Sequence, residues 1–354
     1  MIGYGLAGSA FHAPLVEAVP GLSLASVVTS KPERAEQVRS RYPDATVHQD
    51  ADGLFADPSA HDAVVVAAPN RAHFPLADAT IEAGLHLVVD KPLAATVEEG
   101  ERLAAAAAER GVVASVFHNR RWDGDFLTLR RLVAKGALGD VVRLESRFER
   151  WRPEVDVRKW REGGTPEDAG GLLFDLGPHV IDQALELLGP ARSVNADVRR
   201  LRPGAEVDDD FLVDLEHESG ATSRLSATML AAQAGPRFRA LGTRAAYVKW
   251  GLDVQEDALR EGRTPADFGF GEEPPEAWGR LGSDEASEPV ETERGRYVEF
   301  YEGLERAIRA RDGSPGRPAS SEGAPPVPLE AGVATLRVIE AARASSEQGE
   351  VVPL

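Results

Sequence analysis

A glycine motif near the start of the chain constrains its fold more than any other feature. Residues 3–8, GYGLAG, fit the pattern G-x-G-x-x-G and lead into a helix-compatible run at 10–19. Glycines in this pattern let the backbone turn sharply and approach a pyrophosphate, which unpaired N–H groups at a helix N-terminus can bind. Alone, the motif also fits an ordinary glycine-rich turn after a strand. As a dinucleotide site, it would use Gly3, Gly5, Leu6 and Gly8.

The rest of the first third supplies the context that this motif requires. Apolar runs typical of strands occupy residues 24–28, 63–68, 86–89 and 112–117. Most of them are followed by a helix such as 96–110, and a short run at 46–48 would add an edge strand. This alternation predicts a parallel, doubly wound sheet of the Rossmann type. Only Met1 and Ile2 precede the motif, too few for a first strand, so we expect that the natural chain begins earlier.

The pattern changes near Asn119. A helix is expected at 125–135, followed by strands at 141–151, 193–201, 210–216, 222–229 and 237–241. Short spacings with turn signals favour an antiparallel sheet. Loops are expected at 262–287 and 312–328, and helices at 297–310 and 329–344. We therefore predict an α/β plus α+β fold, with a Rossmann parallel-sheet domain at 1–118. An α+β substrate and oligomerisation domain with a mainly antiparallel open sheet would occupy 119–354.

Charge and composition narrow the range of partners. The net charge of −18 disfavours nucleic acid and anionic membranes, so an anionic ligand needs a local cluster of donors. No run reaches the roughly 18 apolar residues of a membrane span, and the start lacks a signal peptide, so we expect a cytoplasmic protein. The absence of cysteine excludes disulfides and thiolate sites, and we expect no metal. The open face of an antiparallel sheet favours a homo-oligomer, a dimer or tetramer.

The residues that follow the strand expected at 24–28 favour NADP over NAD. An acidic residue would bind the ribose hydroxyls of NAD at this place, about 20 residues beyond the glycine motif. Here the chain reads VVTSKPER at 27–34, and no carboxylate ends the strand. Ser30, Lys31 and Arg34 could instead bind a 2′-phosphate. The alternative is that both basic residues only decorate an exposed helix start, because Glu33 lies between them.

Two further segments carry ionisable groups. Lys91, in Asp90-Lys91-Pro92, follows the strand at 86–89, and carboxyl ends of parallel strands form the ligand crevice of such folds. Asp175 and His179 lie in GGLLFDLGPH, ahead of a helical run. If the helix already includes Asp175, the two residues share one face. If it begins at Pro178, loop geometry must bring them together. Taken singly, a solvated loop lysine and a helix-capping aspartate are the ordinary interpretations.

Together, these segments resemble the Gfo/Idh/MocA oxidoreductase family, with Asp90 in place of the glutamate that is usual before the lysine. The resemblance implies that Lys91, Asp175 and His179 are the catalytic residues. It also implies further cofactor contacts from Pro69, Asn70, His73, Asp90, Lys91, Trp160 and Arg161.

A narrower resemblance within the family covers nearly the whole chain. It rests on 3–15 (GYGLAGSAFHAPL), 118–129 (HNRRWDGDFLTL), 152–155, 182–183 and 255–260. The similar proteins are bacterial dehydrogenases that use NADP and a cyclic polyol, scyllo-inositol. This resemblance implies a substrate site made of Lys91, Asn119, Arg120, Trp122, Asp175 and His179. The structural alternative for Arg120, Arg121 and Asp123 is a network of ion pairs.

The implied reaction is reversible hydride transfer between a secondary ring alcohol and the nicotinamide. His179 would accept the hydroxyl proton, because a histidine titrates close to working pH. Lys91 would stabilise the developing alkoxide, and Asp175 would orient the substrate or the imidazole. Two alternatives stay open. One is a dehydrogenase or reductase of another polyol, sugar or keto-sugar, and the other is a non-enzymatic NADP-binding regulator.

Overall fold

The computed structural model describes residues 1–156, 169–312 and 323–354, which divide into two compact units. The first unit comprises Met1–Asn119, Gln255–Phe270 and Arg296–Val333. The second comprises Arg120–Val254, Gly271–Gly295 and Ala334–Leu354. The first unit thus takes in two later segments. The domain boundary expected after residue 118 stays a prediction, because compactness does not test which segments fold independently.

A parallel sheet forms the centre of the first unit. Its strands are β1 (Ser26–Val28), β2 (Thr46–His48), β3 (Ala63–Val66), β4 (His86–Asp90) and β5 (Ala114–Phe117). β1 pairs with β2, β3 with β4 and β4 with β5, all in parallel. Ile2 bridges the two groups through parallel contacts with Val28 and Val66. The strands expected in this part of the chain are confirmed, and their apolar side chains are buried as in other parallel sheets, except for Val47 and Ala63, which are partly exposed.

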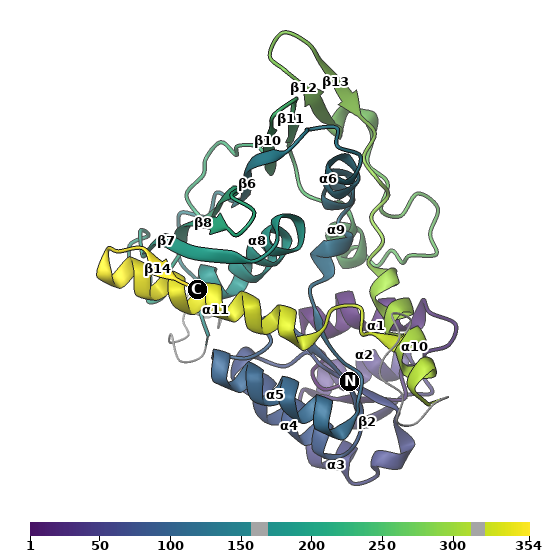
Figure 1. The fold of residues 1–354 in the computed structure, drawn as a ribbon. Coiled ribbons are helices and arrows are strands. Elements are labelled where there is room, and N and C mark those ends of the chain that lie inside the picture. The colour runs from purple at the N-terminus through teal and green to yellow at the C-terminus, as the bar shows by residue number, and fades with distance from the viewer. Residues whose placement is uncertain (157–168, 313–322) are drawn as a thin grey trace. The chain divides into compact units, whose positions relative to one another are not determined.

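Helices cover this sheet. They are η1 (Ala7–His12), α1 (Ala13–Glu17), α2 (Pro32–Arg41), α3 (Ala51–Phe55), η2 (Pro58–Ala60), η3 (Asn70–Ala72), α4 (His73–Glu82), α5 (Val97–Arg110), α9 (Gln255–Arg260), α10 (Val298–Asp312) and the first turn of α11 (Leu329–Gln348). α4 and α5 lie side by side (Figure 1). α5 begins where the sequence predicts, because the Thr96 hydroxyl accepts the N–H of Glu99. Among the described helices, none is long and apolar enough to cross a membrane.

The second unit contains a nine-stranded sheet with the order β13-β12-β11-β10-β6-β9-β8-β7-β14. Only β6 and β9 run in parallel; every other neighbouring pair is antiparallel, as predicted. The strands are β6 (Val141–Glu149), β7 (Ala191–Arg199), β8 (Asp210–His217), β9 (Thr222–Thr228), β10 (Phe238–Gly242), β11 (Ala246–Lys249), β12 (Gly279–Gly282), β13 (Ser287–Val290) and β14 (Val352–Pro353).

One expected loop is partly wrong. The range 262–287 contains β12 and the first residue of β13, besides the short η6 (Pro275–Ala277). The two strands read GRLG and SEPV, so glycine, proline and charged residues hide any alternation of apolar and polar positions. Pairing with β11 and with each other, rather than intrinsic propensity, makes these segments extended.

The faces of the large sheet differ in polarity. α8 (Leu172–Leu188) packs against β6, β8 and β9 (Figure 1), and α6 (Gly124–Ala134) precedes β6 in the same unit. Within β8, Phe211, Val213 and Leu215 are buried, and the alternating Asp214 lies on the other face. There Arg224 of β9 donates two hydrogen bonds to Asp214, at 2.8 and 2.9 Å. The expected homo-oligomer stays a prediction for this face.

Candidate functional site

The glycine motif has two tight positions and one open position. Gly3 has a φ of 100°, and a Cβ there would lie 2.4 Å from the carbonyl oxygen of Ala67. A Cβ on Gly8 would lie 2.2 Å from the carbonyl oxygen of Gly3. At Gly5, in contrast, the nearest atom to an added Cβ is 3.8 Å away. The outer glycines are thus required by the fold itself, and the middle one leaves space for an approaching phosphate.

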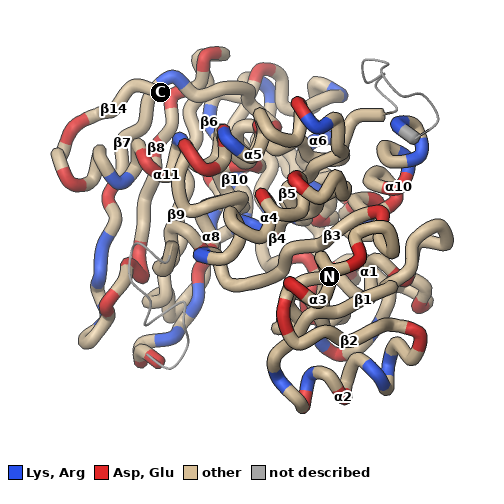
Figure 2. Tube along the Cα trace, turned by 90° about the horizontal axis from the view of Figure 1, so that it is seen from below, with Lys and Arg blue, Asp and Glu red and all other residues tan. Residues whose placement is uncertain are grey.

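One basic group lies beside this loop, and a second lies at the start of the helix that carries it. The atom nearest to the Cβ position of Gly5 is a guanidinium nitrogen of Arg34. Ser30 and Lys31 are exposed at the start of α2, along which basic and acidic residues alternate (Figure 2). Leu6 is 49% exposed at the start of η1. Ser30, Lys31 and Arg34 could bind the phosphates of a dinucleotide. Because the chain as a whole carries a negative charge, an anionic ligand needs local cations of this kind.

Lys91 lies directly after β4, at the carboxyl end of the parallel sheet. The preceding Asp90 accepts a hydrogen bond from the Lys91 N–H at 2.9 Å and lies 3.9 Å from Nε2 of His12. Burial alone would raise the pKa of Asp90, but His12, Lys91 and His73 together outweigh it and lower this pKa to about 2. Asp90 is therefore an anion at neutral pH, next to the predicted catalytic lysine.

His12 and Tyr301 belong to this surrounding, although sequence reasoning gave neither a role. His12 is completely buried, and its Nδ1 lies 2.6 Å from the Tyr301 hydroxyl. Burial, reinforced by Asp90, raises the pKa of Tyr301 well above its usual value, so this phenol stays protonated. A histidine within an apolar helical run was the available signal for His12. Nothing in the sequence joins it to a tyrosine 289 positions away.

His73 is turned toward two backbone carbonyls. Its Nδ1 lies 2.7 Å from the carbonyl oxygen of Pro92, and its Nε2 lies 2.9 Å from that of Ala68. Burial lowers the pKa of His73, while Asp90 and the two carbonyls act in the opposite direction. The neutral ring can donate to only one of these carbonyls. Near it, Pro69 is exposed and Asn70 is buried; direct cofactor contacts of all three residues stay predictions.

In the second unit, α8 includes both Asp175 and His179, so the first of the two sequence alternatives is confirmed. The helix begins at Leu172, and the N–H of Leu173 donates to the Asp208 carboxylate at 2.6 Å. Pro178 lies inside the helix directly after Gly177. The four-residue spacing places Asp175 and His179 on one face. His179 is 5% exposed, and its ring centroid lies 6.2 Å from that of Phe148.

The segment η4 (Asn119–Trp122) contributes Arg120 to a buried polar network. Arg120 donates to Asp123 at 3.2 Å, and its carbonyl accepts from the Gln183 amide at 2.8 Å. Arg237 donates to the same Gln183 side chain at 2.7 Å. Both guanidinium groups lie over the Phe148 ring, 4.8 and 4.1 Å from its centroid. These contacts agree with the structural alternative for Arg120. The roles of Arg120, Asn119 and Trp122 in substrate binding stay predictions.

Next to this network, Arg121 makes a buried ion pair. It donates two hydrogen bonds to Asp182, at 2.8 and 2.6 Å, and also lies 2.8 Å from Glu186. Sequence reasoning included Asp182 in a family motif without a role and missed Glu186 and Arg237. Trp160 and Arg161, which were expected to contact the cofactor, lie outside the described residues.

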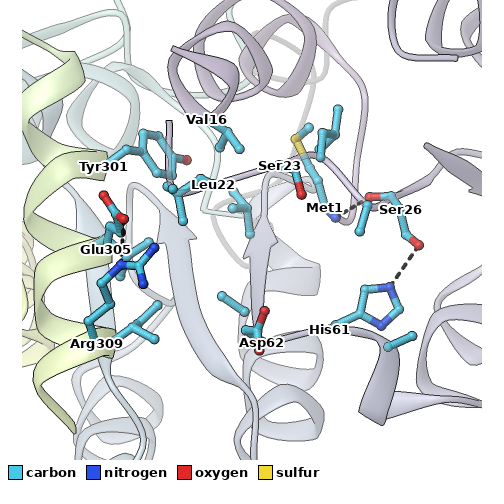
Figure 3. A pocket seen from close by; sticks show the side chains of 18 residues that line it. Met1, Val16, Leu22, Ser23, Ser26, His61, Asp62, Tyr301, Glu305 and Arg309 are labelled. Atoms are coloured by element: carbon cyan, nitrogen blue, oxygen red, sulfur yellow. Dashed lines mark hydrogen bonds and ion pairs between the residues drawn. The ribbon is translucent and has the colours of Figure 1, made fainter. Parts of the chain in front are cut away.

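The first unit also contains a cavity of about 400 Å³, separate from the predicted catalytic and cofactor-binding residues. It opens where β1 and β3 begin, and its wall includes Met1, Ser26, His61 and Glu305 (Figure 3). His61 bonds the Ser26 hydroxyl at 2.8 Å. Among the described residues, none of those predicted for catalysis or cofactor binding contributes to this wall. Since ligands of open α/β sheets bind at the carboxyl ends of the strands, this cavity is not the candidate active site.

Comparisons with known proteins agree with these features. A family model described as an oxidoreductase family with an NAD-binding Rossmann fold matches residues 1–118, and that of the GFO/IDH/MocA C-terminal domain matches 126–248. The chain is 39% identical to scyllo-inositol 2-dehydrogenase (NADP(+)) IolW of Bacillus subtilis, over 100% of the chain and 95% of that protein. It is 41% identical to the oxidoreductase YdgJ of Escherichia coli, over 96% and 93%. The solved structure of the oxidoreductase yvaA from Bacillus subtilis has a TM-score of 0.90 at 39% identity, covering 100% of this chain and 96% of that one.

Proposed function

Since the chain belongs to the Gfo/Idh/MocA family of NAD(P)-binding oxidoreductases, we propose that it is an NADP(H)-dependent dehydrogenase of a cyclic polyol of the scyllo-inositol type. The observation that carries the proposal is the similarity, over the full chain, to a protein named as an NADP-dependent scyllo-inositol dehydrogenase. The position of Lys91 after β4 and the shared face of Asp175 and His179 support it.

The preference for NADP is supported by the start of α2. Ser30, Lys31 and the guanidinium of Arg34 offer hydroxyl and cationic donors, while the strand β1 ends in Val28 without a carboxylate. A 2′-phosphate would find partners there, whereas a ribose diol would lack its usual acidic partner. The glycine motif would hold the pyrophosphate.

When bound, NADP would supply the nicotinamide C4 that accepts a hydride from the alcohol carbon. His179 would take the proton of the same alcohol group on its neutral imidazole. Lys91 would donate a hydrogen bond to the reacting oxygen and stabilise its developing negative charge. Asp175, four residues before His179 on α8, would orient the polyol through its hydroxyl groups. In the reverse direction His179 would return the proton to the ketone oxygen.

The proposal is tested by mixing the purified protein with NADP or NAD and a panel of inositol stereoisomers and hexoses. We expect absorbance of the reduced nicotinamide to rise fastest with NADP and scyllo-inositol. The Lys91→Ala variant should bind NADP but lose most turnover, because the lysine acts mainly in the transition state. Faster turnover of a hexose would move the substrate class to sugars. Cofactor binding without turnover of any substrate would favour a regulator.

A further inference from the structure

Two buried histidines that the proposed mechanism does not use contact the segment that carries Lys91. His12 faces the side chain of Asp90, and His73 contacts the carbonyl of Pro92. We propose that His12 and His73 are positioning residues, which fix the backbone on either side of Lys91 and thereby place its ammonium group. This inference rests on the proposed function, because it takes Lys91 to be the catalytic lysine.

His12 acts on the segment through a carboxylate. Its ring packs against Phe117, with 4.2 Å between the centroids, and its Nδ1 lies 2.6 Å from the Tyr301 hydroxyl. Because that phenol is protonated, it can donate to Nδ1, and the ring proton is then assigned to Nε2. Nε2 faces Oδ1 of Asp90 at 3.9 Å, and the same oxygen accepts the Lys91 N–H at 2.9 Å. Asp90 thus accepts the peptide N–H of the lysine and lies at ion-pair distance, beyond hydrogen-bond distance, from the buried ring.

His73 acts on the other end of the segment. It is the first residue of α4, and its ring reaches the carbonyl oxygens of Pro92 at 2.7 Å and of Ala68 at 2.9 Å. The ring therefore lies between the turn after β4 and the turn after β3, and in its neutral form it donates to one of the two carbonyls. These are adjacent carboxyl ends of the parallel sheet, where ligands of such folds bind.

Both histidines are suited to support, and for His73 this role would replace the direct cofactor contact that the sequence predicts. Their side chains are at most 1% exposed, and their ring nitrogens face groups of the first unit. A lysine amine stands at the end of a flexible four-carbon stem. Its place is defined only if the residue that carries it is held, so supporting contacts of this kind tune activity without touching the substrate.

The experiment compares His12→Phe, His73→Asn and Tyr301→Phe with His61→Gln as the matched control. His61 is a hydrogen-bonded histidine of the same unit, but its partners are Ser26 and Asp57. The first measurement needs no substrate: amine labelling of Lys91 is followed by mass spectrometry, relative to exposed Lys135. Fully buried Lys249 reports on global unfolding. The second measurement separates kcat from the NADP dissociation constant, which is obtained by fluorescence titration.

We expect labelling of Lys91 relative to Lys135 to rise in His12→Phe and His73→Asn, with Lys249 still protected. Where turnover is measured, kcat should fall by about 10- to 100-fold, with less change in NADP affinity. Tyr301→Phe should show a smaller effect of the same kind, and His12→Gln, which keeps an N–H donor, should recover part of the loss. An unchanged labelling ratio in both histidine variants would overturn the proposal. An inactive wild-type protein with the expected labelling would overturn only the proposed function.

Discussion

The two regions that hold the predicted catalytic residues are built from different kinds of buried polar group. Around Lys91 lie one carboxylate, two histidines, a phenol and backbone carbonyls. Around α8, which carries His179, the buried contacts join guanidinium groups to carboxylates and to an amide. Within the first set, burial and neighbouring charges shift the pKa values of Asp90 and His73, whereas guanidinium groups stay charged at any working pH.

The two regions should therefore respond differently to mutation and to acid. Removal of one partner from a buried ion pair leaves an uncompensated charge, so the stability of the region around α8 should be sensitive to mutation of its ion pairs. The region around Lys91 should in addition lose stability in strong acid, because burial and neighbouring charges set the pKa of Asp90. The predictions below test this contrast.

The largest effect is expected for His179→Asn, which tests whether the histidine of α8 acts in chemistry and not only in packing. Asparagine keeps polarity but cannot accept a proton at working pH, so the oxidation rate should fall by about 10²- to 10⁴-fold. The variant should also lose the decline of oxidation on acidification. The matched control is His217→Asn, because His217 is a buried histidine of the same unit bonded to Gly189 and Ser223. A rate near that of wild type in His179→Asn would place the base elsewhere.

The next prediction concerns the buried pair of Arg121 and Asp182. Asp182→Asn should lower the free energy of unfolding by about 3 kcal/mol, because Glu186 is then the one ionised partner that Arg121 keeps among the described residues. Urea unfolding measures this change. The matched control is Asp214→Asn on the exposed sheet face, where loss of the pair with Arg224 should be worth under about 1 kcal/mol. Equal losses in the two variants would mean that burial does not make the pair around α8 more sensitive to mutation than an exposed pair.

The same contrast explains what could be predicted from the sequence. The parallel sheet and the segments of Lys91 and His179 were predictable, because β-branched runs and short motifs are local signals. The helical position of Asp175 was open until the structure placed Pro178 inside α8.

Other parts of the structure leave no local signal. The partnership of His12 with Tyr301 and that of Gln183 with Arg237 join residues far apart in the chain. β12 and β13 were missed because extended pairing, and not propensity, holds them. Cysteine, metal-ligand and glycine motifs can be recognised by spacing, whereas buried supporting contacts become visible only in the fold.

Asp90→Asn tests the acid sensitivity of the first region. The pKa of Asp90 is lowered from 3.8 to about 2, so its carboxylate supplies stability that is fully present above about pH 4 and is lost as the pH falls toward 2. The variant should therefore be less stable by about 2 kcal/mol at pH 6, and this difference should shrink in acid. Urea unfolding of both proteins between pH 6 and pH 3 measures it. A difference independent of pH would mean that the carboxylate charge is not what stabilises this region.

The smallest effect is expected at the exposed edge of the first region, where Ser30 precedes α2. Ser30→Asp should weaken NADP binding by about tenfold and leave NAD binding nearly unchanged, because the new carboxylate repels a 2′-phosphate. The matched control is Ser40→Asp, which adds the same charge at an exposed position near the other end of α2. Ser40 is ten positions after Ser30, and the helical part of this span, from Pro32 to Ser40, alone rises about 12 Å along the axis, beyond the screening length of about 8 Å at physiological salt. Fluorescence titration with both nucleotides measures the two affinities.

If both variants weaken NADP binding equally, bulk charge and not a local phosphate site determines binding, and the donors around Arg34 lose their proposed role. If only Ser30→Asp does so, the selective edge of the nucleotide site lies at the start of α2, and catalysis by Lys91 should be unchanged at saturating NADP.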